Sequence, residues 1–139
     1  LVPYLIAVIR TVLYYFNAPK VEIILDGETF TQRSLMTSIM NGRRMGGAFM
    51  MTPKSKPDDG CFDLCIADLV SRPEILFLIG RFIKGTQEEH RAIRFRQSTK
   101  VTLTALDGSM PCHADGETIC YEGDQLTIEL LPAYLSLIY

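Results

Sequence analysis

The chain has 139 residues, a length that suits one domain with a buried core and is short for a two-domain enzyme. Its 14 basic and 16 acidic residues leave a net charge of −2, which offers a nucleic acid no overall electrostatic attraction. The composition therefore favours a single globular domain, 1–139, without a nucleic-acid partner.

The chain opens with the apolar run LVPYLIAVIRTVLYYF, which Arg10 interrupts. This run is shorter than the roughly 20 residues that a membrane-spanning helix needs, and it lacks the charged leader and cleavage site of a signal peptide. We expect a packed helix over residues 1–16 that ends before Pro19. We also expect the chain to be part of a longer protein, since the sequence starts at Leu1 inside an apolar run. A cytoplasmic location is expected because reduced thiols are the default for its cysteines.

A hairpin is predicted next, because Asp26-Gly27 separates the apolar segment 21–25 from a second segment that starts near Thr29. The second strand is expected to lead into the glycine-rich loop NGRRMGG at 41–47. An antiparallel sheet therefore begins in this part of the chain.

In the segment 62–67, large apolar side chains at positions 62, 64 and 66 alternate with Asp63, Cys65 and Ala67. This period of two predicts a strand with one face on a core. A helix should follow, because Ser71 is a good N-cap, Glu74 completes a capping box, and Pro73 fits the first turn. Gly85 is expected to end this helix.

The last third reads as a series of short strands, at Ile93 and Phe95, 101–105, 125–131 and 134–139. Short strands with two helices predict a mainly β (α+β) fold, an antiparallel β-sandwich with two peripheral helices. No βαβ repeat is visible, which argues against a Rossmann domain.

The cysteines form no C-x-x-C pair and have no zinc-like spacing with His90 or His113. Cys61 and Cys65 would lie about 13 Å apart along one strand, at about 3.3 Å per residue, too far for a disulfide. Reduced thiols are expected at all four positions, which are Cys61, Cys65, Cys112 and Cys120.

The loop KPDDGCF contains an oxygen-rich candidate site. The carboxylate of Asp59 with the main-chain carbonyls of Lys56 and Cys61 could hold Mg²⁺ or Ca²⁺, which prefer oxygen ligands. A solvated turn is the simpler interpretation of Asp59-Gly60.

Basic residues gather in two other places. Arg43 and Arg44 lie in a glycine-rich loop suited to phosphate, although the loop lacks the P-loop pattern. Arg94 and Arg96 should share one strand face, which could meet an anionic membrane or simply be solvated.

Asp-Gly occurs four times, and the tetrapeptide DGET twice, at 26–29 and 115–118. The first copy is expected to form a turn. The second follows Pro111 and His113 in MPCHADGE, and only this copy suggests a functional role from its surroundings.

Taken in order, NGRRMGGAF, PKSKPDDGCFDLCIAD, SRPEILFLIGRFIKG, HADGE and ELLPAYLSL resemble the C-terminal domain of the diacylglycerol kinase and sphingosine kinase-like lipid kinases, particularly the soluble bacterial members. The resemblance covers nearly the whole chain. It implies a two-domain enzyme whose N-terminal domain carries a GGDGT nucleotide-binding motif, and no GGDGT occurs in this sequence.

Several site residues follow from the resemblance. It implies a structural metal loop formed by Lys56, Asp59 and Cys61, and it assigns Glu117 as general base with Asp115 beside it. Arg43 and Arg44 are weaker candidates for contacts with the cofactor.

The resemblance also implies ATP and Mg²⁺ as cofactors, with Ca²⁺ as an alternative ion in the loop. A lipid such as diacylglycerol would be the substrate, and phospholipid metabolism the context. The missing nucleotide-binding domain, a peripheral membrane contact and a homodimer are expected partners. Two alternatives stay open: a non-catalytic lipid- or protein-binding module, and part of an NAD kinase.

Overall fold

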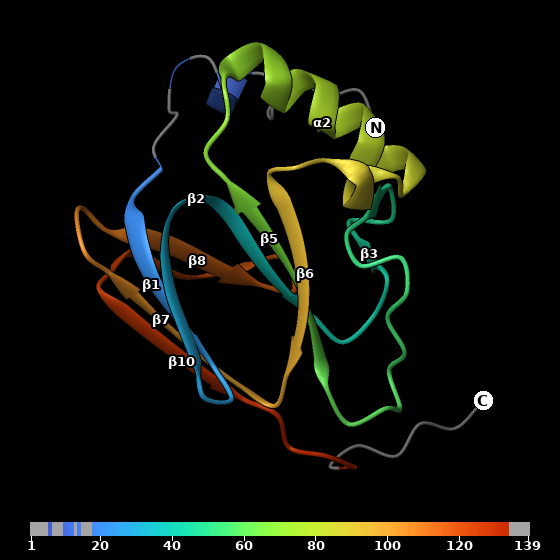
Figure 1. Ribbon diagram of the computed structural model, residues 1–139, viewed down its shortest axis with the longest axis vertical. Helices are drawn as coiled ribbons and strands as arrows, with labels where there is room; N and C mark the ends of the chain where they lie inside the picture. The colour runs from blue at the N-terminus through green and yellow to red at the C-terminus, as the bar shows by residue number, and fades with distance from the viewer. Residues whose placement is uncertain (1–5, 7–9, 13, 15–17, 134–139) are drawn as a thin grey trace.

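The computed structural model describes residues 6, 10–12, 14 and 18–133 (Figure 1). The predicted helix over 1–16 lies largely outside these residues, and the predicted strand over 134–139 lies entirely outside them. The elements of the described part are β1 (Lys20–Leu25), β2 (Glu28–Met40), β3 (Arg44–Met45), β4 (Phe49–Met50), β5 (Phe62–Asp68), α2 (Arg72–Lys84), a 3₁₀ helix η1 (Gln87–Glu89), β6 (Ile93–Ser98), β7 (Lys100–Ala105), β8 (Met110–Ala114), β9 (Glu117–Gly123) and β10 (Gln125–Glu129).

Six of these strands form one antiparallel sheet with the order β10-β7-β1-β2-β5-β6. The long strand β2 pairs with β1 through its first half and with β5 through its second half. The register shifts between Ser34 and Met36, an irregularity of the kind that bends a strand. The mainly β, sandwich-like fold is therefore confirmed.

The predicted hairpin at Asp26-Gly27 is confirmed, with Leu25 paired to Glu28. Asp26 and Gly27 both have positive φ angles, 34° and 99°, as a tight two-residue hairpin turn requires. The Asp26 carboxylate also accepts hydrogen bonds from the backbone N–H of Thr99, at 2.7 Å, and of Lys100, at 3.2 Å. One aspartate thus shapes its own turn and holds the β6–β7 turn beside it.

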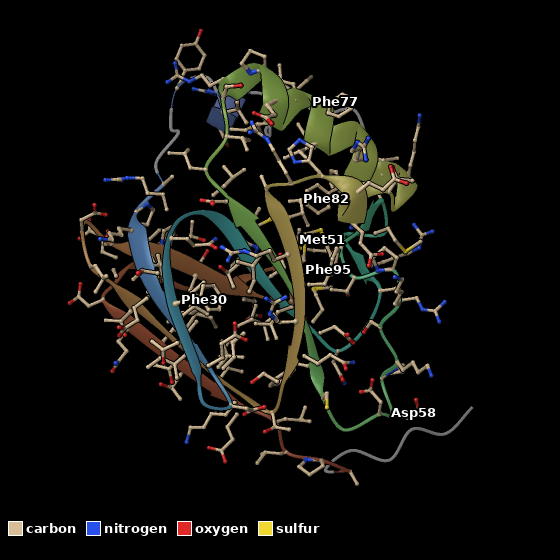
Figure 2. The ribbon with its side chains drawn as sticks, in the orientation of Figure 1. Phe30, Met51, Asp58, Phe77, Phe82 and Phe95 are labelled. Atoms are coloured by element: carbon tan, nitrogen blue, oxygen red, sulfur yellow. The ribbon has the colours of Figure 1, made fainter. Side chains whose placement is uncertain are left out.

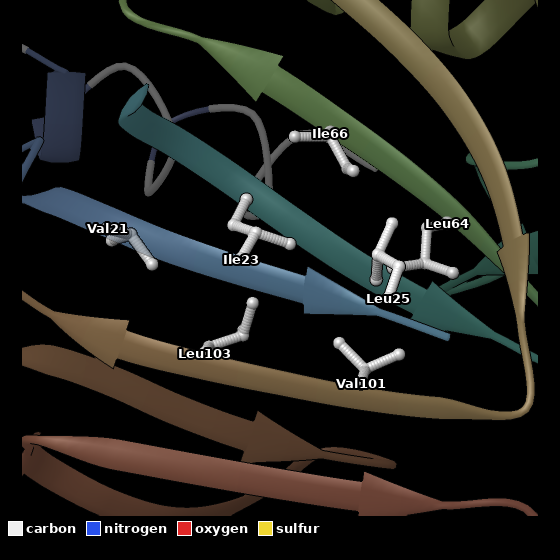
Figure 3. Close-up of a cluster of buried hydrophobic side chains, with 7 residues drawn as sticks. All are labelled: Val21, Ile23, Leu25, Leu64, Ile66, Val101 and Leu103. Atoms are coloured by element: carbon white, nitrogen blue, oxygen red, sulfur yellow. The ribbon is translucent and has the colours of Figure 1, made fainter. Parts of the chain in front are cut away.

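The first core cluster lies between the two halves of the bent sheet (Figure 3). β1, β5 and β7 each contribute side chains that are almost fully shielded from solvent. Its members are Val21, Ile23, Leu25, Leu64, Ile66, Val101 and Leu103.

The second core cluster lies on the opposite face of β5, and α2, which lies beyond one end of β5 in Figure 1, contributes side chains to it. Cys65 and Ala67 of β5 pack there with Leu78 and Phe82 of α2. The expectation that β5 buries only one face was wrong, because α2 and the 45–51 segment cover the other.

The predicted bounds of α2 are correct, and Gly85 ends it with a left-handed φ of 73°. The predicted capping box does not form, because the Ser71 side chain makes no capping hydrogen bond. Glu74 instead approaches Nε2 of His90 at 3.2 Å and the Arg91 guanidinium at 3.5 Å. Tertiary contacts therefore compete successfully with the local cap.

Candidate functional site

A second hairpin, which the sequence pattern does not predict, carries the second DGET. β8 and β9 pair on either side of Asp115-Gly116, whose φ angles are 50° and 91°. The two copies of DGET therefore form the same kind of turn. Glu117 is the first residue of β9 and pairs with Ala114, so its backbone position is fixed by the turn.

Both acidic side chains of this turn are exposed to solvent. Across the described residues, neither the Asp115 carboxylate nor the Glu117 carboxylate has a hydrogen bond or an ion pair, and the two do not bond to each other. An open carboxylate at such a turn is accessible to a ligand from solvent. The structure thus presents Glu117 without showing a group that orients it.

Asp59, the second aspartate of the KPDDG loop, is engaged in local hydrogen bonds. Its Oδ1 accepts from the backbone N–H of Cys61 at 3.1 Å, and its Oδ2 accepts from Nε2 of Gln97 at 3.2 Å. The same Gln97 nitrogen donates to Asp63 at 3.1 Å. Gln97 was not predicted, since nothing in the sequence sets it apart as an edge-strand residue.

The donor set of this loop suits a hard cation by its chemistry. Asp59 and Lys56 are exposed and Cys61 is half-buried, so water could complete a coordination shell. Within the described residues, no group of three or more His, Cys, Asp or Glu side chains could hold a metal. Main-chain oxygens would therefore have to supply much of the coordination.

The structure brings the basic NGRRMGG loop and the acidic KPDDG loop together. A cavity of about 540 Å³ lies between the 42–44 and 55–58 segments. Nε of Arg43 donates to the carbonyl of Ser55 at 3.0 Å, and the Thr52 hydroxyl donates to the carbonyl of Gly42 at 2.8 Å. These bonds hold the two loops side by side, and Asp58 marks this region in Figure 2.

A second cavity, of about 450 Å³, adjoins the first through Ser55. Asp63 and Gln97 line it, beside the Lys54–Glu88 ion pair of 2.7 Å. Ser55 Oγ and Asp63 Oδ2 are buried without a hydrogen-bond partner in the described part of the chain. This cavity cannot be predicted from a local sequence pattern, because its lining comes from four separate segments.

Arg94 and Arg96 share one face of β6, as predicted, but both contact β2. The Arg94 guanidinium lies 4.9 Å from the centre of the Phe30 ring and donates to Gln32. Nε of Arg96 lies 3.5 Å from the Glu28 carboxylate. These arginines therefore bridge the sheet, and a membrane contact at this face stays a prediction.

No helix among the described residues is long and apolar enough to cross a membrane.

Comparisons with solved structures show where this fold occurs. A diacylglycerol kinase from Bacillus anthracis str. Sterne superposes with a TM-score of 0.69 at 22% identity, over 93% of this chain and 42% of that one. A chain described as "a putative diacylglycerol kinase" from the same organism gives 0.68 at 23% identity, over 89% and 41%. This chain thus spans less than half the length of these structures, and at such identities they show the fold alone.

No curated protein matches the chain significantly. The family model described as the YegS C-terminal NAD kinase beta sandwich-like domain matches residues 2–139. This match spans almost the whole sequence and agrees with the bent antiparallel sheet described above. The chain therefore belongs to the YegS C-terminal domain family, as its resemblance to the C-terminal domains of lipid kinases predicted.

Proposed function

We propose that this chain is the C-terminal domain of an ATP-dependent lipid kinase, which transfers the γ-phosphoryl group to a lipid hydroxyl such as that of diacylglycerol. The observation that carries the proposal is the family match over residues 2–139 together with an open Glu117 at the β8–β9 turn. The likeness to structures described as diacylglycerol kinases supports it. An N-terminal domain outside this chain would bind ATP.

In this proposal Glu117 takes the proton of the attacking lipid hydroxyl. Phosphoryl transfer needs that one acid–base step, while the remainder is positioning and neutralisation of charge. Asp115 precedes Glu117 by two residues, and its role would be to orient Glu117 or a nearby water once substrate is bound. Mg²⁺, when bound with ATP, neutralises the phosphate oxygens.

The KPDDG loop would hold a second, structural ion. The carboxylate of Asp59 and the carbonyls of Lys56 and Cys61 would bind Mg²⁺ or Ca²⁺, with water in the remaining positions. Arg43 and Arg44, which line the cavity next to Lys56, are proposed to meet the phosphate groups of the nucleotide. The ion would stiffen the side of the cavity opposite these arginines.

The test is ATP-dependent phosphorylation of diacylglycerol by the full-length protein, wild type against Glu117→Gln. Removing a general base should lower kcat by about 10²-fold to 10⁴-fold. Glu122→Gln, an exposed position on the same strand, is the matched control and should keep activity. Circular dichroism should show all three proteins folded.

Equal activity of wild type and Glu117→Gln would remove Glu117 from the chemistry. The same assay should include NAD⁺ as acceptor, because an NAD kinase is an alternative for this family. Phosphorylation of NAD⁺ and not of lipid would replace the proposed substrate.

A non-catalytic binding module is a second candidate, favoured by exposed apolar side chains on β9. Ile119 is 60% exposed and Tyr121 is 80% exposed. Co-sedimentation with lipid vesicles distinguishes the two candidates when combined with the kinase assay. Vesicle binding without phosphoryl transfer to any lipid would favour the binding module.

A further inference from the structure

Two cysteines that belong to no C-x-x-C pattern face each other across the β8–β9 hairpin. Cys112 of β8 and Cys120 of β9 are direct cross-strand partners. Both are half-buried, whereas the residues immediately before and after each of them are exposed. Since neighbours along a strand point to opposite faces, the two thiols share the inner face of the hairpin.

The backbone geometry of this pair suits a disulfide. Directly opposed residues in antiparallel strands have Cα atoms about 4.5 to 5.5 Å apart. Natural disulfides span Cα separations of about 4.4 to 6.8 Å. The register shifts on both sides of Cys112, so the pair lies at an irregular point of the ladder.

The electrostatics of the pair agree with this placement. Burial, and then the neighbouring Cys120, raise the pKa of the Cys112 thiol above its ordinary value. The contribution of Cys120 to this pKa shift agrees with the cross-strand pairing of the two residues. The same shift means that a smaller fraction of Cys112 is thiolate at neutral pH, so its oxidation should speed up as pH rises.

We propose that Cys112 and Cys120 are an oxidative modification site, which forms a reversible intramolecular disulfide with a low-molecular-weight disulfide such as oxidised glutathione. One thiolate attacks a glutathione sulfur, forming a mixed disulfide and releasing one glutathione. The second thiolate then attacks the protein sulfur of that mixed disulfide and releases the other glutathione. Two protein thiols lose two protons and two electrons, and one oxidised glutathione becomes two reduced molecules.

The bond would close the hairpin on both sides of its turn. Cys112 precedes Asp115 by three residues, and Cys120 follows Glu117 by three. A cross-link there restricts the movement of the Asp115-Gly116 turn. Its effect on phosphoryl transfer rests on the proposed function, whereas bond formation itself does not.

The other two cysteines provide internal comparisons. Cys65 is fully buried in the second core cluster, and burial raises its pKa to about 12. Cys61 is half-buried and lies just before β5, with no cysteine opposite it in the described sheet pairings. Neither should enter an intramolecular disulfide.

The test treats the full-length folded protein with oxidised glutathione, blocks free thiols with iodoacetamide and cleaves after glutamate. Cleavage after Glu117 separates Cys112 from Cys120. Mass spectrometry should then find the two peptides joined, and dithiothreitol should release them. Cys112→Ser and Cys120→Ser should each yield no joined peptides and should keep a glutathione adduct on the remaining thiol.

Alkylation of both cysteines after oxidation, or joining of either one to Cys61, Cys65 or another chain, would overturn the proposal. Hydrogen exchange gives a second readout, since amides at 110–123 should exchange more slowly after oxidation in wild type and not in Cys112→Ser. Unchanged exchange would overturn the stiffening of the turn. Peptide mapping needs no substrate, so its outcome is independent of whether the protein phosphorylates lipid.

Discussion

At the level of single residues, the Asp26 carboxylate connects two turns that are distant in sequence. The backbone N–H of Thr99, its strongest partner, lowers the pKa of Asp26 below 3.8, and the Thr99 hydroxyl and Lys100 N–H act in the same direction. A lowered folded-state pKa adds stability above the unfolded-state pKa, and this stability is lost as pH falls through the folded-state value.

We therefore expect Asp26→Asn to be less stable than wild type at pH 7, with a difference that shrinks as the pH is lowered below about 4. Urea unfolding across this pH range measures the effect. Asp58→Asn is the control, because Asp58 is exposed and has no hydrogen bond among the described residues. A constant difference at every pH would show that the Asp26 charge is not responsible.

Asp59 carries a second residue-level prediction, which concerns the proposed ion. Mg²⁺ or Ca²⁺ should raise the Tm of wild type, since a ligand present at 100 times its Kd stabilises by about 2.7 kcal/mol. Asp59→Asn keeps an acceptor for the Cys61 N–H but loses the charge, so the rise should be smaller. Asp58→Asn should respond as wild type does. Equal rises in all three proteins would place the ion elsewhere.

At the level of elements, the two glycines of the α2 region should respond to alanine with opposite signs. Gly85 has φ 73°, and a Cβ there would lie 3.0 Å from Cγ of Met50. Gly85→Ala should therefore destabilise by about 1 kcal/mol or more. Gly80 lies inside the helix with open space around a Cβ, so Gly80→Ala should stabilise by up to about 1 kcal/mol. Urea unfolding tests both, and two changes of the same sign would contradict the geometry.

The same elements show how far local sequence patterns reach. Asp26-Gly27 predicted its hairpin correctly because apolar segments flank it on both sides. Asp115-Gly116 forms the same turn, but its strands are mostly exposed and therefore lack the alternation that marks a half-buried strand. Local signals thus predicted hairpins only where a core lies beneath them.

The candidate site was predicted in pieces and not as an arrangement. Motif order identified Glu117, Asp59 and the arginine pair, whereas the contact between the 42–44 and 55–58 loops depends on how β2 and β5 pair. Gln97 joins the candidate site only because β6 lies beside β5. Tertiary register of this kind leaves no mark in a short sequence window.

On the scale of the whole molecule, the bent sheet is the frame for every candidate residue. Figure 1 shows β2 passing from the half formed with β1 to the half formed with β5. Met110 of the β8–β9 hairpin and Phe62, which follows the KPDDG loop, both pack against the first core cluster. The proposed catalytic hairpin and metal loop are therefore attached to one hydrophobic centre.

Strand β5 belongs to both cores at once, through Leu64 and Ile66 on one face and Cys65 and Ala67 on the other. If either core loses its packing, β5 is displaced and the other core loses buried contacts as well. The two halves should therefore melt together, giving a single calorimetric peak whose van't Hoff and calorimetric enthalpies agree. A cavity-forming substitution in either core, such as Leu78→Ala on the buried side of α2, should shift the whole peak without splitting it. A substitution near the helix would therefore also destabilise the distant β1–β7 half.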